Sequence, residues 1–259
     1  MVTACLKIRR ATVRLTSAVS LIIASLACGL PQVHAYSGQV LYTPDRATYP
    51  NASANYTWAI RLQQSGSANG TILATHANGE NYDTGVPLGD PVYRSVDGGA
   101  TWSALSRLVD TQHNGWQVIE PSLFELPRQE GPYPAGTLYA AIAVLPTNGT
   151  AVDLQIYRSA DQGQTWHYLS TPASQPNRAT SGRGVGVYEP TLQVDKAGNL
   201  VCYFSDERQS AAGYNQAIGH VVSRDGGQTW GPRSWTSACR TAPPAQACRS
   251  SSCCPTDSI

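Results

Sequence analysis

From residue 36 onward, short runs of apolar residues alternate with polar positions and end at turn residues. Runs of this kind, rich in β-branched and aromatic side chains, predict β-strands. No stretch longer than about ten residues shows the apolar period of a helix. The pattern therefore predicts an all-β chain whose strands fall into three similar groups. The groups are 59–62, 71–75 and 92–94; 121–124, 136–144 and 154–158; and 190–193, 198–204 and 218–222.

An eight-residue pattern, Ser-x-Asp-x-Gly-x-Thr-Trp, follows each group of strands. Its copies begin at Ser95, Ser159 and Ser223, so successive copies are 64 residues apart (159 − 95 and 223 − 159). The Asp can accept hydrogen bonds from nearby backbone N–H groups and the Gly supplies a positive φ, which together predict a tight hairpin. The Trp then re-enters a strand and offers a large apolar face to the neighbouring unit. A fixed period of this length indicates a repeat architecture.

About 64 residues with four strands correspond to one blade of a β-propeller. The sequence therefore predicts a propeller of four-stranded antiparallel blades, of which about three are present. We expect the propeller to occupy residues 36–232 and an irregular tail, rich in Cys and Ser, to occupy residues 233–259.

Residues 1–35 have the pattern of a secretory signal peptide: basic residues, an apolar run over 15–30 and a small-residue exit at 33–35. The alternative, a transmembrane anchor, needs about 20 unbroken apolar residues, and Ser17, Ser20 and Ser25 interrupt this run. We therefore expect a secreted, extracellular protein that makes no membrane contact after cleavage. Four sequons, at Asn51, Asn55, Asn69 and Asn148, agree with a secreted glycoprotein.

Composition narrows the partners. Loss of residues 1–35 removes four basic and no acidic residues, so the formal net charge changes from +1 to −3 (1 − 4), and a nucleic-acid partner is not expected. The five His are scattered and the tail cysteines lack zinc-ligand spacing, so we expect neither metal nor cofactor. Between residues 36 and 230 the only cysteine is Cys202, which means that disulfides do not frame the main fold.

The three octets resemble the Asp-box (BNR) repeats of sialidases and related glycosidases. In that superfamily the box is a structural turn on the outer rim, so the resemblance implies no catalytic role for Asp97, Asp161 or Asp225. Residues 42–232 further resemble the exo-arabinanase-like proteins of glycoside hydrolase family 93, which are secreted and six-bladed. This resemblance rests on Thr-Tyr-Pro at 48–50, Ile-Arg-Leu at 60–62 with Gly-Thr-Ile-Leu-Ala at 70–74, Val-Tyr-Glu-Pro-Thr-Leu at 187–192, Tyr-Phe-Ser-Asp-Glu-Arg at 203–208 and Asn-Gln at 215–216.

The resemblance implies an exo-acting glycosidase on arabinan or a related neutral polysaccharide, with a polysaccharide or oligosaccharide as its partner. Cleavage of a glycosidic bond usually needs two carboxyl groups. Glu189 follows a Gly-rich loop at 181–186 and precedes Pro190, which fixes the backbone beside it; the alternative for Glu189 is a structural pair with an arginine. Glu207 is the second catalytic candidate, within a charged run that either binds sugar hydroxyls or solvates a loop.

Further residues complete the candidate site. Glu120 precedes Pro121 as Glu189 precedes Pro190, 69 residues later (189 − 120), and repeat equivalence alone is enough to explain it. Trp116 and Tyr188 adjoin the two Glu-Pro pairs and are candidate sugar platforms, with packing between blades as the alternative. The predicted substrate-binding residues are Arg61, Trp116, Glu120, Tyr188, Asp206, Arg208 and Gln216.

Two departures from the family pattern affect the expected function. The arginine expected directly after Tyr49-Pro50 is replaced by Asn51, with Arg61 as a substitute, so a neutral sugar is favoured over sialic acid. The family's second catalytic carboxylate is expected on a following blade, which this chain lacks. We therefore expect a truncated gene model or frameshifted terminus. The alternatives are a Cys-rich tail that joins two half-propellers, a carbohydrate-binding propeller without catalysis, a sialidase, or a fragment without function.

Overall fold

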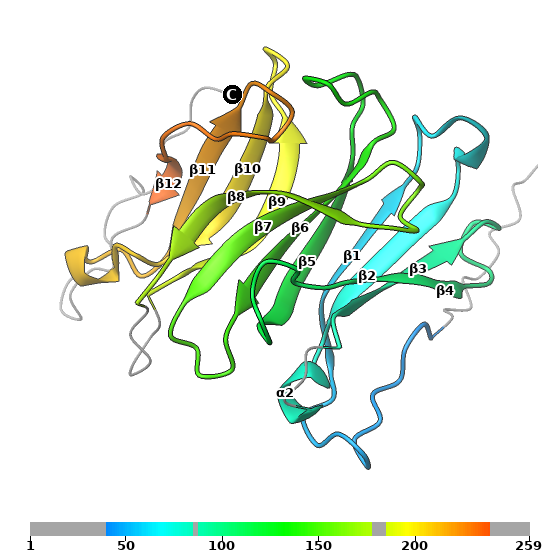
Figure 1. Cartoon of the computed structure of the whole chain (residues 1–259), viewed down its shortest axis with the longest axis horizontal. Helices are drawn as coiled ribbons and strands as arrows, with labels where there is room; N and C mark the ends of the chain where they lie inside the picture. The colour runs from blue at the N-terminus through cyan, green and yellow to red at the C-terminus, as the bar shows by residue number, and fades with distance from the viewer. Residues whose placement is uncertain (1–39, 85–87, 178–184, 239–259) are drawn as a thin grey trace, which may run out of the picture. The chain divides into compact units, whose positions relative to one another are not determined.

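The computed structural model describes residues 40–84, 88–177 and 185–238 (Figure 1). Nearly all regular structure is β. The twelve strands are β1 Ala54–Arg61, β2 Ile72–Asn78, β3 Asp90–Ser95, β4 Ser103–Leu108, β5 Gln117–Glu125, β6 Leu138–Leu145, β7 Val152–Ser159, β8 His167–Gln175, β9 Val187–Val194, β10 Leu200–Asp206, β11 Ala217–Ser223 and β12 Ser234–Ala238. Three short helical turns accompany them: η1 Gly66–Ala68, α2 Asn81–Thr84 and η2 Ser210–Ala212.

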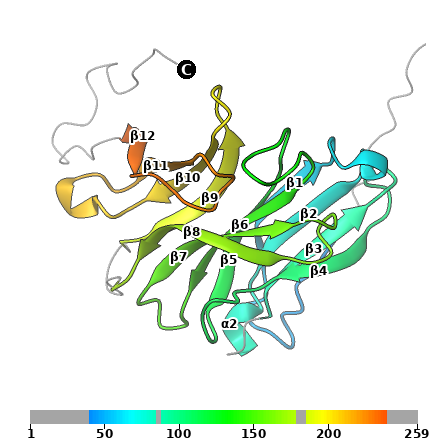
Figure 2. The ribbon, with the colours of Figure 1, turned by 45° about the horizontal axis from the view of Figure 1, so that its top comes forward.

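The strands form three four-stranded antiparallel sheets, each built from four consecutive strands in chain order. These are the three predicted blades of a β-propeller, and we number them 1 to 3. The first strands of the blades, β1, β5 and β9, lie side by side, β1 against β5 and β5 against β9, and form the inner edge (Figures 1 and 2). The all-β propeller prediction is confirmed.

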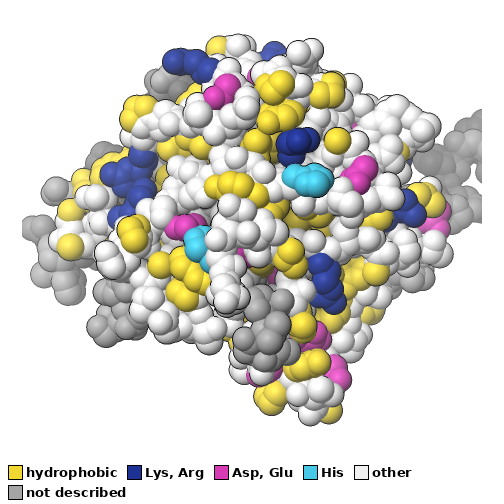
Figure 3. Space-filling model, in the orientation of Figure 1, with side chains coloured by type: hydrophobic (Ala, Val, Ile, Leu, Met, Phe, Trp, Pro, Cys, Tyr) yellow, Lys and Arg dark blue, Asp and Glu magenta, His cyan; other side chains and the backbone are white. Residues whose placement is uncertain are grey.

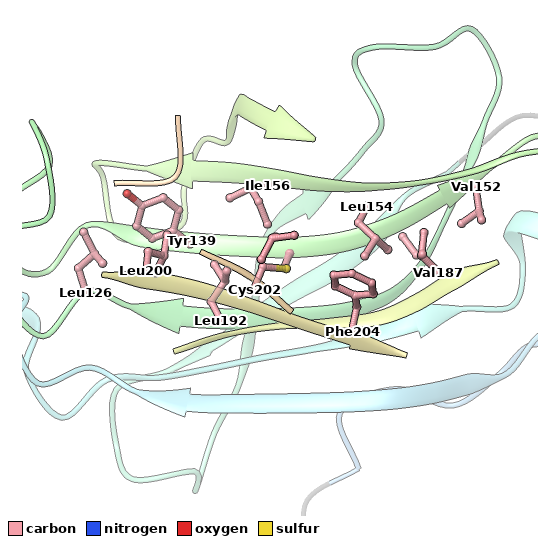
Figure 4. Close-up of a cluster of buried hydrophobic side chains, with 13 residues drawn as sticks. Leu126, Tyr139, Val152, Leu154, Ile156, Val187, Leu192, Leu200, Cys202 and Phe204 are labelled. Carbon is pink, nitrogen blue, oxygen red and sulfur yellow. The ribbon is translucent and has the colours of Figure 1, made fainter. Parts of the chain in front are cut away.

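Two apolar clusters hold the blades together. One lies between blades 1 and 2 and includes Leu73, Val92 and Ile142. The other lies between blades 2 and 3, where Leu154 faces Phe204 (Figure 4). Strand β6 is buried along almost its whole length, because the middle blade is covered on both faces. That double burial explains the unbroken apolar run in its sequence.

The Asp boxes form the β3–β4, β7–β8 and β11–β12 turns, as the octet predicts. In the first box, Thr101 donates from its backbone N–H to Asp97 Oδ1 (2.9 Å) and from its hydroxyl to Oδ2 (2.5 Å). The same two bonds recur in the boxes of Asp161 and Asp225. These bonds lower the pKa of Asp97 to about 2, the hydroxyl of Thr101 contributing most, so the carboxylate stays charged and structural.

Box tryptophans also join neighbouring blades. Trp166 Nε1 of blade 2 donates to Ser106 Oγ of blade 1 at 3.0 Å, and Trp230 of blade 3 donates to Ser170 of blade 2 at 2.9 Å. Each serine passes the contact on, because its hydroxyl donates to the carbonyl oxygen of the second box glycine, Gly163 or Gly227. The predicted packing of these indoles on neighbouring units is therefore present.

The predicted boundary at residue 232 is wrong by six residues (238 − 232). Strand β12, Ser234–Ala238, pairs with β11 and completes blade 3. Its five side chains are all exposed, so it has none of the apolar alternation that marks a strand in sequence. The expected signal peptide at 1–35 and the tail from 239 onward lie outside the described residues.

Candidate functional site

Each inner strand contains a β-bulge near its beginning. The pairing register shifts between Asn55 and Trp58 in β1, between Ile119 and Ser122 in β5, and between Tyr188 and Thr191 in β9. The first residue of each bulge has a positive φ: 49° at Tyr56, 55° at Glu120 and 56° at Glu189. L-residues other than glycine rarely adopt this conformation, which costs about 1–2 kcal/mol.

The five non-glycine residues with positive φ in the described part of the chain include these three. Strained positions of this kind cluster at functional sites. Pro121 and Pro190 occupy the second bulge position of β5 and β9, where the ladder needs no N–H group. The geometry thus marks the same point on all three blades.

The bulges also define one end of the propeller. Because each blade is antiparallel, the loops before the inner strands, the β2–β3, β6–β7 and β10–β11 loops and the three bulges share one end. The Asp-box turns lie at the other end. We call these the bulge end and the Asp-box end.

Glu120 and Glu189 meet at the bulge end. Glu120 Oε2 accepts a hydrogen bond from the backbone N–H of Glu189 at 2.7 Å. Two residues further along β5, Ser122 Oγ donates to the carbonyl oxygen of Pro190 at 2.6 Å. These two bonds join the bulges of blades 2 and 3, so the relative placement of the two glutamates is fixed by both backbones.

The environment of Glu120 favours its protonated form. Its residue is only 9% exposed, and burial raises the pKa of its carboxyl to about 7, with further contributions in that direction from the carboxylates of Glu189 and Glu207. The N–H of Glu189 and the hydroxyl of Tyr56 donate to the carboxyl and oppose the rise. At neutral pH, Glu120 therefore retains a proton in a large fraction of molecules, whereas an ordinary glutamate has lost it.

A protein-family model described as a BNR repeat-like domain matches residues 65–251. The chain belongs to the BNR repeat-like family. No curated protein sequence matches it significantly.

Solved structures of arabinan-degrading enzymes share the fold of this BNR repeat-like chain. The α-L-arabinanase of Penicillium chrysogenum, solved with arabinobiose, is 33% identical over 74% of this chain and 51% of its own, with a TM-score of 0.62. The glycoside hydrolase family 93 α-L-arabinofuranosidase of Fusarium graminearum, also with arabinobiose, is 29% identical over 72% of this chain and 50% of its own, with a TM-score of 0.61. The predicted resemblance to that family is confirmed, and the chain spans about half the length of these enzymes.

Two tyrosines accompany the glutamates of this BNR repeat-like protein. Tyr56 and Tyr82 are each 52% exposed. The Glu120 carboxylate is the main cause of the raised pKa of Tyr56, while burial followed by Glu120 raises the pKa of Tyr82. Sequence analysis missed both residues. Tyr56, however, lies 64 residues before Glu120 (120 − 56), the same period that separates the Asp boxes.

The charged run at 206–208 divides between two roles. The carboxylate of Glu207 acts on Glu120, and its backbone N–H donates to Gly186 O at 2.9 Å, so Glu207 belongs to the bulge end. Asp206, by contrast, is fully buried and pairs with Arg208 (2.8 Å) and Arg233 (2.6 Å). The prediction that Asp206 and Arg208 bind sugar is wrong for Asp206, which is enclosed by this network, and Arg208 is committed to it.

Arg61 was predicted to contact substrate, and the structure places it elsewhere. It is the last residue of β1, at the Asp-box end, whereas Tyr56 lies near the beginning of the same strand. Arg61 lines a hollow of about 510 Å³ with Asn69, Arg94 and Gly98. An antiparallel strand of this length carries its first and last side chains to opposite ends of the blade.

The predicted sugar platforms also differ in their surroundings. The Tyr188 ring packs on the cluster between blades 2 and 3 and covers Gly186, so the platform prediction is wrong for Tyr188. Trp116 lies at the bulge end, half-buried, and stacks on His113 with ring centroids 3.7 Å apart. Gln216 is exposed in the same set of loops and donates to Ser205 Oγ.

Other ligand classes find little support in the described ranges. Within them, no group of three His, Cys, Asp or Glu side chains is arranged to hold a metal ion, and no helix is long and apolar enough to cross a membrane. Basic and acidic side chains are interspersed on the face shown in Figure 3.

Proposed function

We propose that this protein is an exo-acting glycoside hydrolase of arabinan or a related neutral polysaccharide, with its reaction centre at Glu120 and Glu189. The observation that carries the proposal is the 2.7 Å bond between the Glu120 carboxylate and the Glu189 N–H. It brings two carboxyl-bearing residues from neighbouring blades to one point. A protonated and an ionised carboxyl group are what glycosidic bond cleavage requires.

The surroundings assign the two roles. Glu120 is buried and has a pKa of about 7, so it suits a general acid that gives its proton to the glycosidic oxygen as the bond to the anomeric carbon breaks. Glu189 is exposed and supplies the negative charge that an oxocarbenium-like transition state needs. This assignment replaces Glu207, the second catalytic candidate from sequence, with Glu120, and gives Glu207 an electrostatic role.

Charge at the bulge end supports a neutral substrate. The charged side chains that act on Glu120 are the carboxylates of Glu189 and Glu207. Arg61 lies at the other end, and Arg208 pairs with buried Asp206. An anionic sugar placed here would meet carboxylates rather than guanidinium groups, which disfavours sialic acid. The arabinobiose bound by both similar enzymes is uncharged and agrees with this proposal.

Hydrolysis of linear arabinan by the full chain, with reducing-sugar detection, tests the function. We expect Glu120→Gln and Glu189→Gln each to lower the rate about 100-fold or more. Glu125→Gln is the matched control, because Glu125 lies on β5 with Glu120 but at the Asp-box end, where it accepts from Gln63 and Gln64. Equal rates in all variants would refute the proposed centre. Arabinan binding without turnover by the wild type would instead identify a carbohydrate-binding propeller.

We propose a location outside the cell on the strength of the basic and apolar pattern at residues 1–35. N-terminal sequencing of the secreted protein tests this, with a first residue near Tyr36 as the expected result.

A further inference from the structure

The three bulges hold two glutamates and one tyrosine. Tyr56 occupies in blade 1 the position that Glu120 and Glu189 occupy in blades 2 and 3, with the same register shift and nearly the same φ. A tyrosine at a positive φ is a strained choice, since the bulky ring gains nothing from the left-handed region. Such a choice persists where the side chain has a role that outweighs the backbone cost.

Glu120 is held from both sides. On one side the backbone N–H of Glu189 in blade 3 donates to Oε2 at 2.7 Å. On the other side the phenol hydroxyl of Tyr56 in blade 1 donates to the same carboxyl group. The middle glutamate therefore receives one donor from each neighbouring blade, and the donor from blade 1 is a side chain that substitution can remove.

The packing explains why the tyrosine reaches so far. Trp58, two residues after Tyr56, donates from Nε1 to Leu123 O of β5 at 2.9 Å. This bond fixes β1 against β5 close to both bulges. Tyr56 thus projects toward Glu120 from a strand whose position relative to β5 is already set.

We propose that Tyr56 is a positioning residue of this site: its hydroxyl orients the Glu120 carboxyl group and stabilises its ionised form. The inference rests on the proposed function for its catalytic consequence, but the contact itself does not. The other groups that face Glu120 are the carboxylates of Glu189 and Glu207 and the phenol of Tyr82. Both carboxylates favour the protonated form, so Tyr56 is the side chain that balances them.

A direction follows for the Tyr56→Phe variant. Removal of the hydroxyl takes away a donor to the charged form, so the pKa of Glu120 rises above about 7. A hydrogen bond to a charged group corresponds to a shift on the order of one pH unit. A carboxyl group that holds its proton more tightly is a weaker acid toward the glycosidic oxygen, so kcat falls more than KM changes.

The decisive measurement is a pH titration of the full chain labelled with ¹³C at the glutamate carboxyl carbons, followed by NMR, with Glu120→Gln to assign the signal. We expect the Glu120 midpoint to rise in Tyr56→Phe and to stay in place in Tyr82→Phe. Tyr82 is the matched control because it is equally exposed and acts on Glu120 only through charge. An unchanged or lower midpoint in Tyr56→Phe overturns the proposal.

Two further arms keep the conclusion clear. Tyr56→Asn removes the phenol at a residue type that tolerates positive φ, so it serves if the Phe variant folds poorly, and the same rise is expected. The pH profile of kcat/KM on arabinan should move to higher pH with the NMR midpoint. A shifted midpoint in a protein that hydrolyses no arabinan supports the Tyr56 contact and refutes the proposed function. Arabinan hydrolysis with a midpoint unmoved by Tyr56→Phe does the opposite.

Discussion

The Glu120 carboxylate accepts a hydrogen bond from the backbone N–H of Glu189 across the boundary between two blades, with 2.7 Å between oxygen and nitrogen. One candidate catalytic side chain is therefore held by the backbone of the other. Because both residues begin a bulge with positive φ, the N–H of Glu189 is turned away from its own sheet and is free to make this bond.

The assignment of Glu120 as the acid predicts a dependence on the leaving group. With 4-nitrophenyl arabinofuranoside, the departing phenolate is stable without a proton, so Glu120→Gln should keep a large share of the wild-type rate. On arabinan the same variant should lose about 100-fold or more. Steady-state rates on the two substrates provide the test, with Glu189→Gln slow on both. Equal losses of Glu120→Gln on both substrates would contradict the acid role.

The rate should fall on the alkaline side of neutrality. The pKa of Glu120 is raised to about 7, mainly by burial, so the protonated fraction declines as the pH rises through that value. We expect kcat/KM on arabinan to decrease about tenfold for each pH unit well above 7. A pH profile of the wild type measures the limb, and a rate that stays constant to pH 9 would exclude Glu120 as the acid.

Stability should follow the same titration with a defined sign. The folded-state pKa of Glu120 is raised from 4.5 to about 7, so its favourable contribution is present below the unfolded value and is lost as the pH rises through about 7. We expect Glu120→Gln to gain stability over the wild type between pH 5 and 8, by up to about 3 kcal/mol. Urea unfolding at both pH values provides the comparison. A constant difference between the two proteins would mean that Glu120 has an ordinary pKa.

Backbone strain at the third bulge predicts an order among Glu189 variants. Glu189 has φ 56°, which alanine tolerates poorly and glycine tolerates freely. We therefore expect Glu189→Gly to be more stable than Glu189→Ala by about 1 kcal/mol. Lys196, which lies in the β9–β10 turn and is absent from the residues with positive φ, is the control site, where the Gly variant should be no more stable than the Ala variant. Thermal unfolding of the four variants decides the matter.

The hydrogen bonds between blades predict equal losses at two equivalent serines. Ser106 and Ser170 each accept from a box tryptophan and donate to a box glycine. Substitution by alanine leaves the indole N–H and the carbonyl without these partners, which costs about 1–3 kcal/mol. Ser103→Ala, on the exposed beginning of β4, should change the free energy of unfolding by less than about 0.5 kcal/mol. Similar losses at Ser103 would show that the bonds to the tryptophans do not stabilise the blades.

The blades could be predicted from the sequence because their signals are local. Strand alternation and the Ser-x-Asp-x-Gly-x-Thr-Trp octet depend on neighbouring residues and recur at one period. Strand β12 was missed because all of its side chains are exposed, so no apolar face marks it. Its formation depends on pairing with β11, which is a tertiary interaction.

The site was predictable only in part. The equivalence of Glu120 and Glu189 followed from the repeat, but the proton affinity of Glu120 depends on its burial between blades, which no local pattern reveals. Arg61 was misplaced because sequence distance from Tyr49 and Pro50 was considered without the length of β1. Tyr188 was misplaced because adjacent residues on a strand point to opposite faces. Tyr56 was within reach, since one repeat period before Glu120 leads directly to it.

The recurrence of the bulge makes the inner edge a row of equivalent sockets. Each duplicated blade brings another copy of the same backbone kink, already aimed at its neighbours, before any chemistry is chosen. A single codon per blade then decides whether that socket holds an acid, a base or a phenol. Diversification of such a centre requires no new backbone geometry, only exchange of the side chain at a position that duplication has already built.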